Sequence, residues 1–87
     1  MTLTIFLDTP GAGPRQLAVR VRDISCVGLG LLSSRPYPAR QKFTFELAKV
    51  NGNGATIVVC EMVHCERVAD RIFLIGATFI PDQIHRI

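Results

Sequence analysis

Hydrophobic and polar residues alternate along most of the chain with a period of two, which is typical of half-buried β-strands. At the start of the chain, Leu3, Ile5 and Leu7 share one parity, and the threonines at 2 and 4 share the other. An alternating or continuously apolar segment returns five more times, and breaker residues separate the segments. The pattern predicts six strands, over residues 2–7, 16–23, 28–31, 42–47, 55–67 and 71–80.

The breaks between these segments predict the turns. Residues 8–14 contain two prolines and two glycines, which cannot hold a strand ladder, and residues 33–38 predict an irregular loop. The sequence Asn-Gly-Asn-Gly at 51–54 favours a type I′ hairpin between the fourth and fifth strands. The fifth strand is apolar on both parities, which predicts a bulge or bend near Glu61. Residues 81–82 (Pro-Asp) resemble the first turn of a helix.

Six strands with short turns and no helical period indicate an all-β barrel or sandwich in a single domain over residues 1–87. One face of the third predicted strand is almost bare, because Gly28 and Gly30 alternate with Leu29 and Leu31. Glycine in a strand marks either close packing or the close approach of another group, so a neighbouring segment or a ligand is expected at this face.

Charge, apolar run length and cysteine content limit the classes of function and the compartment that the sequence allows. Ten basic residues against seven acidic ones give a net charge of +3, and eight of the ten are arginines. Arginine favours bidentate recognition of phosphate or carboxylate, but the charges are too dispersed to predict DNA binding. The longest apolar run, residues 72–80, is too short for a membrane span. Three cysteines without repeated spacing and the lack of a basic leader predict a reduced, cytoplasmic protein.

Residues Asp23–Gly28 read Asp-Ile-Ser-Cys-Val-Gly, a DxSxxG motif between an arginine-containing strand and a glycine-leucine strand. With this context the chain resembles the PilZ domain family over nearly its whole length, Leu3–Ile80. The segments that carry the rest of the resemblance are Leu29–Leu32 with the proline-containing loop after it, Glu61–Cys65, and Leu74–Phe79.

The resemblance implies a six-stranded antiparallel PilZ-type β-barrel that acts in bacterial signalling. It implies a receptor module for the second messenger cyclic di-GMP, without enzymatic activity or a cofactor, that signals to a partner protein or domain. The motif residues Asp23, Ser25 and Gly28 are then the ligand-binding residues. A carboxylate accepts hydrogen bonds from the edge of guanine, a hydroxyl bonds a base or phosphate, and glycine leaves room for a flat ring.

The family also uses an RxxxR segment before the first strand, and no RxxxR precedes the first predicted strand of this sequence. Either the natural chain continues upstream, or the protein is a degenerate member that lacks these arginines. Arg20 and Arg22 are candidates to border the ligand, although they also fit an ordinary solvated strand face. Asp23 and Ser25 fit a plain turn as well as a ligand site. Without the arginine pair, binding is expected to be weak, since each lost charge-assisted bond is worth about 1.5 to 3 kcal/mol.

Three alternatives stay open. The first is an adaptor that binds only proteins, through an exposed sheet edge or the loop Arg35–Arg40. The second is a barrel that binds single-stranded nucleic acid, which the inward parity of the phenylalanines disfavours. An enzyme is the least expected, because no nucleophile and base motif is present. The sequence leaves the oligomeric state open.

A metal-ligating group of residues and a lone tyrosine also bear on the function. Cys60, His64 and Cys65 are metal-ligating types, but in a regular strand 60 and 64 share a face while 65 points away, so no metal site is predicted. Tyr37, between two prolines, is either an exposed contact for a partner or an anchor that packs on the end of the barrel. The anchor is the favoured interpretation.

Overall fold

The computed structural model describes residues 1–9, 11, 13–48, 52 and 54–80. Within this part of the chain all regular structure is β-strand, and no helix is long and apolar enough to cross a membrane. The strands are β1 (Thr2–Thr9), β2 (Gly13–Ile24), β3 (Gly28–Ser33), β4 (Lys42–Ala48), β5 (Ala55–Ala69) and β6 (Ile72–Phe79).

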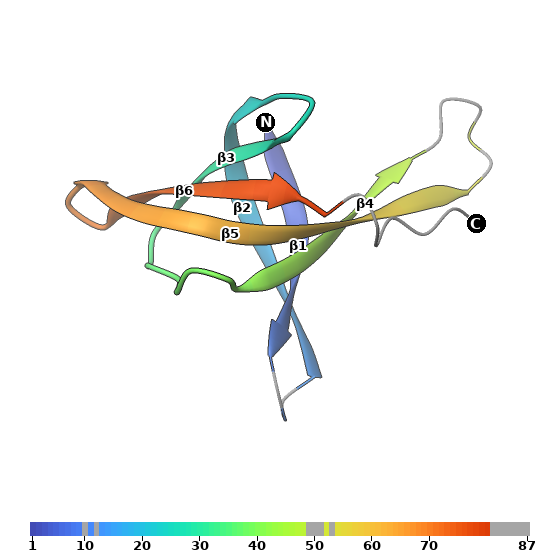
Figure 1. The fold of residues 1–87 in the computed structure, drawn as a ribbon, viewed down its shortest axis with the longest axis horizontal. Coiled ribbons are helices and arrows are strands. Elements are labelled where there is room, and N and C mark those ends of the chain that lie inside the picture. The colour runs from blue at the N-terminus through green and yellow to red at the C-terminus, as the bar shows by residue number, and fades with distance from the viewer. Residues whose placement is uncertain (10, 12, 49–51, 53, 81–87) are drawn as a thin grey trace.

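The six strands close into a barrel in the order β1-β2-β3-β6-β5-β4, and every neighbouring pair is antiparallel. β1 closes the barrel by pairing with β4 at Phe6 and Leu7. Figure 1 shows the β1–β2 hairpin extending away from the body, with the long, curved β5 lying across it. The predicted six-stranded antiparallel barrel is confirmed.

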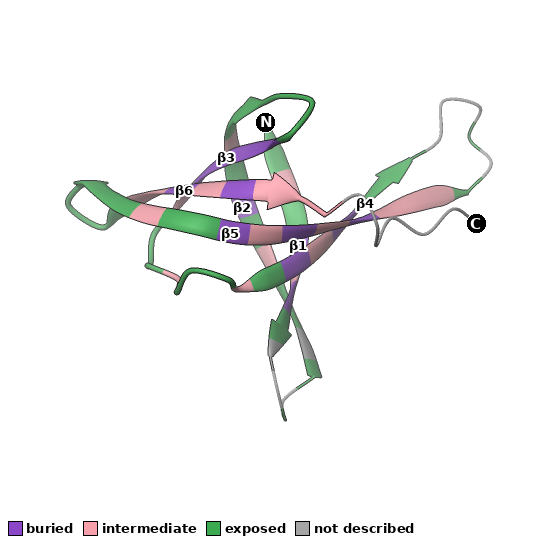
Figure 2. Ribbon diagram, viewed as in Figure 1, coloured by how far each residue is buried: buried purple, intermediate pink, exposed green. Residues whose placement is uncertain are grey.

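The barrel interior is filled by the apolar parity of each strand, as the alternation predicts. Figure 2 places the buried positions where the strands cross the middle of the molecule. No polar or charged side chain is buried among the described residues. Twelve hydrophobic residues form the core: Ile5, Leu7, Val19, Leu29, Leu31, Phe43, Phe45, Val58, Cys60, Met62, Ile75 and Ala77. Tyr37 is half-buried and packs against this core, which confirms the anchor interpretation.

The first hairpin is longer than predicted. β1 continues to Thr9 and β2 starts at Gly13, so that Asp8 lies opposite Pro14 within the predicted turn. The expectation that residues 8–14 cannot pair was therefore wrong. This part of β2 has a neighbouring strand on one side only, and a proline near the start of such a strand leaves no ladder hydrogen bond unmade. Gly11 and Gly13 have positive φ values of 80° and 74°, which allow the tight connection.

The second predicted hairpin joins the expected strands. β4 pairs with β5 in register from Lys42 opposite Glu61 to Ala48 opposite Ala55. The predicted type I′ turn falls on residues 51–54, of which 51 and 53 lie outside the described residues. The predicted helical turn at 81–82 and His85 also lie outside them.

The predicted irregularity in β5 is a bulge between Met62 and His64, close to the expected position near Glu61. Met62 lies opposite Ala77 in the core, and His64 lies opposite Gly76 on the outer face. The extra residue is Val63, which is 51% exposed. A second shift follows between Arg67 and Ala69, near the end of the strand.

Candidate ligand-binding site

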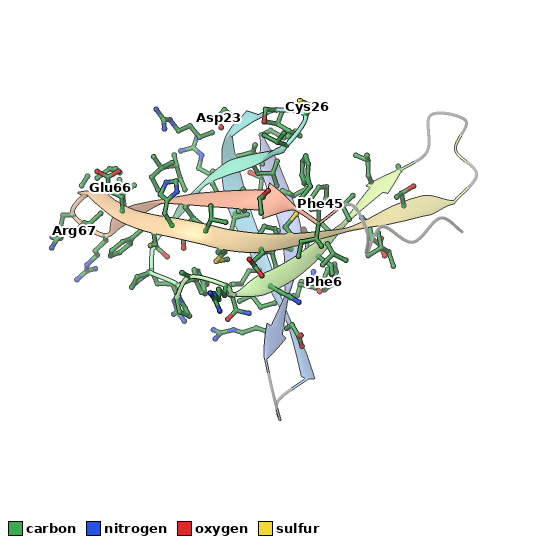
Figure 3. The ribbon with its side chains drawn as sticks, in the orientation of Figure 1. Phe6, Asp23, Cys26, Phe45, Glu66 and Arg67 are labelled. Atoms are coloured by element: carbon green, nitrogen blue, oxygen red, sulfur yellow. The ribbon has the colours of Figure 1, made fainter. Side chains whose placement is uncertain are left out.

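The DxSxxG residues lie where β2 turns into β3. Figure 3 shows Asp23 and Cys26 together at this corner, while Glu66 and Arg67 lie far from it on β5. β2 and β3 lose register by one residue here, since Val21 pairs with Leu31 and Asp23 pairs with Gly30. The extra residue is Arg22, so the strand contains a β-bulge at this position.

The bulge determines which face Asp23 occupies. Leu17, Val19 and Val21 share the core-facing parity, and strict alternation would turn residue 23 toward the core as well. The inserted Arg22 shifts the alternation by one, so that Asp23 lies on the outer face with Gly30. Asp23 is exposed, and its carboxylate accepts none of the hydrogen bonds found among the described residues.

The turn after Asp23 is held by hydrogen bonds. The hydroxyl of Ser25 accepts from the Val27 N–H at 3.2 Å, and the Ser25 N–H donates to the Gly28 carbonyl at 2.9 Å. The Val27 carbonyl accepts from the Phe79 N–H at 2.9 Å and from the Thr78 hydroxyl at 3.2 Å, which fastens the turn to β6. The Ser25 hydroxyl thus has a structural role in the turn. Its own proton is still free for donation to a ligand, because a hydroxyl both accepts and donates.

Gly28 is required for packing. It is buried, and a Cβ at this position would collide with the backbone carbonyl of Ala77 on β6. The space left by its missing side chain is therefore filled by the neighbouring strand and is not open to a flat ring. A role of Gly28 at a ligand site would be indirect, through the shape of the turn.

A row of four residues crosses the outer face beside this turn. Asp23 on β2 pairs with Gly30 on β3, Gly30 with Gly76 on β6, and Gly76 with His64 on β5. Residues that lie directly opposite each other share a face, so all four belong to the outer surface. A Cβ at Gly30 would lie 2.6 Å from Asp23 Oδ1, and a Cβ at Gly76 would overlap the His64 imidazole. On the outer surface, the Asp23 side chain thus lies over Gly30, and the His64 side chain lies over Gly76, its partner on the neighbouring strand.

The two candidate arginines take different positions. Arg20 lies opposite Leu32 on the outer face, next to the row of Asp23 and Gly30, and is exposed. Arg22 is the bulged residue and is also exposed. Three residues of extended strand span about 10 Å, so both guanidiniums come from backbone within that distance of Asp23. The structure thus brings Asp23, Ser25, Arg20 and Arg22 to one end of the barrel surface.

The cysteines and His64 do not come together. The prediction that residues 60 and 64 share a face was wrong, because the bulge at Val63 turns His64 outward while Cys60 stays fully buried. Cys65 is partly buried and packs against the core. Burial raises the pKa of the Cys60 thiol to about 12, so it stays protonated near neutral pH. No group of three metal-ligating side chains occurs within the described part of the chain.

His64 and Gly76 are site residues that the sequence interpretation did not identify. The bare face of β3 was the available signal, since it predicted that another group would lie close to Gly28 and Gly30. The structure identifies these groups as the backbone of β6 and the carboxylate of Asp23. A histidine on β5, three strands away from Asp23 on β2 in the barrel, could not be assigned to the same row without the register.

The comparisons with known proteins identify no relative. No protein-family model matches the chain, and neither the curated proteins nor the solved structures contain a match.

Proposed function

We propose that the chain is a PilZ-type module that binds cyclic di-GMP at the outer end of β2 and β3 and passes the signal to a partner protein or domain. The observation that carries this proposal is the bulge at Arg22, which turns Asp23 to the exposed face two residues before Ser25. An exposed carboxylate can accept from the N1–H and N2–H groups of guanine. The role requires no catalytic group.

The neighbouring residues fit the other parts of such a ligand. Arg20 and Arg22 are exposed and carry the fork-shaped donors that suit phosphate oxygens. The His64 imidazole, two strands beyond Gly30, supplies an aromatic group on the same outer face for a purine to contact. We propose that His64 contributes to base binding together with Asp23, which adds a fourth strand to the site.

Isothermal titration of cyclic di-GMP into the 87-residue chain tests the proposal, with linear GMP as the control for general phosphate binding. We expect saturable heat with cyclic di-GMP that Asp23→Ala abolishes. Asp70→Ala is the matched control, since Asp70 is an exposed aspartate in the turn between β5 and β6. Binding that survives Asp23→Ala, or that is lost equally in both variants, would contradict the assignment of the site.

The second candidate is a PilZ-like adaptor that binds proteins and not cyclic di-GMP. Two apolar side chains at this corner favour it, because Ile24 at the end of β2 is 60% exposed and Val27 in the turn is 67% exposed. Exposed apolar side chains that gather on a small domain are a feature of protein contact surfaces. No heat with cyclic di-GMP, in this chain and in one extended to include any native upstream arginines, favours the adaptor.

A further inference from the structure

An open cleft of about 440 Å³ lies beside the N-terminal half of β2. Its walls come from residues 15–20 of β2, from residues 32–37 at the end of β3 and in the following loop, and from residues 71–72 in the turn between β5 and β6. Within the described part of the chain, no aspartate or glutamate lines it. The cleft is lined by four arginines, and we refer to it as the arginine cleft: Arg15, Arg20, Arg35 and Arg71.

These four arginines have no acidic partner in the described part of the chain, where the one ion pair joins Arg67 and Asp70. Their combined charge of four exceeds the net charge of +3 of the whole protein. Like charges held around one cleft repel each other, and a bound anion relieves that repulsion. Arginine forks match carboxylates and phosphates bidentately, so the cleft selects for negative charge.

The arginine cleft also contains an unpaired strand edge. β2 pairs with β1 along residues 13–20, but its pairing with β3 begins only at Arg20, opposite Leu32. β3 ends at Ser33 and the chain turns away into the loop. Within the described structure, residues 15–19 of β2 therefore present backbone N–H and C=O groups without a strand partner on the cleft side. An extended segment bound there would take the place along β2 that β3 leaves empty.

The side chains at this edge indicate the composition of such a segment. Leu17 and Val19 lie on the core-facing side of β2, and Tyr37 closes the same side from the loop. Arg20 lies on the outer side. Because opposite residues in a sheet share a face, the side chains of an added strand that lie opposite Leu17 and Val19 would meet the apolar wall, and those near its two ends would lie close to Arg15 and Arg20. The edge thus suits a segment that contains both apolar and acidic residues.

We propose that the arginine cleft docks an extended acidic segment of a partner protein, which pairs with residues 15–19 of β2 as an additional strand. Addition of a strand to an exposed sheet edge is a known mode of peptide recognition, in which backbone bonds supply affinity and side-chain pockets supply specificity. The same arginines repel the identical edge of a second copy, which prevents edge-to-edge association. The proposal does not depend on cyclic di-GMP binding.

The test measures the affinity of a fluorescein-labelled, acetylated hexapeptide of alternating glutamate and valine by fluorescence anisotropy. Arg35→Glu is expected to weaken binding at least tenfold, because it places a negative charge in the cleft. Arg40→Glu is the matched control: it makes the same charge change in the same loop, but Arg40 does not line the cleft. We expect less than a threefold effect from Arg40→Glu, and far-UV circular dichroism checks that both variants fold.

A second peptide, with proline in place of the central valines, tests the backbone pairing. It keeps the charge but cannot complete a ladder, and we expect at least a tenfold loss of affinity. Bound glutamate-valine peptide should also slow hydrogen exchange at one or more amides between Gln16 and Val19. Two results would assign the cleft to small anions and overturn the proposal. One is equal affinity for the proline peptide, and the other is full competition by inorganic triphosphate with no slowing of hydrogen exchange. Equal losses from Arg35→Glu and Arg40→Glu would also overturn it.

The outcome is separable from that of the proposed function. Asp23→Ala is expected to leave the affinity for the peptide unchanged, because Asp23 does not line the arginine cleft. Arg35→Glu is expected to leave cyclic di-GMP binding within threefold of the unsubstituted chain. The two binding experiments can therefore fail independently.

Discussion

The contact between His64 and Gly76 can be tested by a double-mutant cycle. In Gly76→Ala the new Cβ would lie 2.5 Å from Nδ1 of His64, about 1 Å inside ordinary van der Waals contact. Either the imidazole or the strand must move to relieve this overlap. Overpacking in a well-packed core costs about 1 to 3 kcal/mol, but the exposed His64 imidazole can rotate away, so the lower end of this range applies here; replacing a glycine within a strand returns about 0.5 to 1 kcal/mol. We expect Gly76→Ala to lower the free energy of unfolding by at most about 1 kcal/mol.

Removal of the imidazole should reverse the sign of this effect. In a His64→Ala background the added Cβ meets no imidazole, so Gly76→Ala should be neutral or stabilise the barrel by up to about 1 kcal/mol. The expected coupling energy between the two positions is about 0.5 to 2 kcal/mol, within the range measured for contacting residues. Gly28→Ala provides the contrast, because its Cβ would meet the Ala77 carbonyl, a backbone group that cannot rotate away. Its cost should be the same with and without His64.

Urea unfolding followed by far-UV circular dichroism is the suitable assay, because the chain contains no tryptophan and only one tyrosine. Extrapolated free energies carry an uncertainty of about 10 to 15%, so the coupling is taken from the shifts in urea midpoint between the variants, compared at a common m value. If Gly76→Ala cost the same in both backgrounds, the close contact of His64 with Gly76 would be refuted. The row of Asp23, Gly30, Gly76 and His64 would then not form the surface described above.

Three further predictions concern the core, a cysteine and a surface charge. Leu31→Ala should lower the free energy of unfolding by about 2 to 5 kcal/mol, because Leu31 is fully buried, and a smaller loss in urea unfolding would contradict its burial. The raised pKa of Cys60 should lower stability by about 1.4 kcal/mol between pH 8 and pH 10, since above pH 9 the thiol ionises only in the unfolded chain. Cys60→Ala should lack this part of the loss, and a thiol reagent should modify Cys26 before Cys60 in the folded protein. Asp70→Ala should change stability by less than about 0.5 kcal/mol, because its ion pair with Arg67 is exposed; a larger change would show a buried contribution.

Much of the fold follows from local patterns. The period-two alternation located all six strands and, away from the bulges in β2 and β5, the side that faces the core, because burial of one face of a sheet demands that pattern. The glycine-asparagine segment at 51–54 identified the hairpin between β4 and β5. The predicted bounds of the first hairpin were wrong, because β2 has a partner strand on one side only at Pro14, where a proline is tolerated.

The candidate site depended on contacts that no local pattern contains. The sequence by itself located Asp23 and Ser25 in a corner, but alternation from Val21 would have turned residue 23 toward the core. The bulge at Arg22 is visible only in the register of β2 against β3, because an extra residue in one strand is defined by its partner. The unpaired edge of β2 likewise follows from where β3 ends in space. Local sequence determined which residues form strands and which face is apolar, and the pairing of distant strands decided which polar residues share a surface.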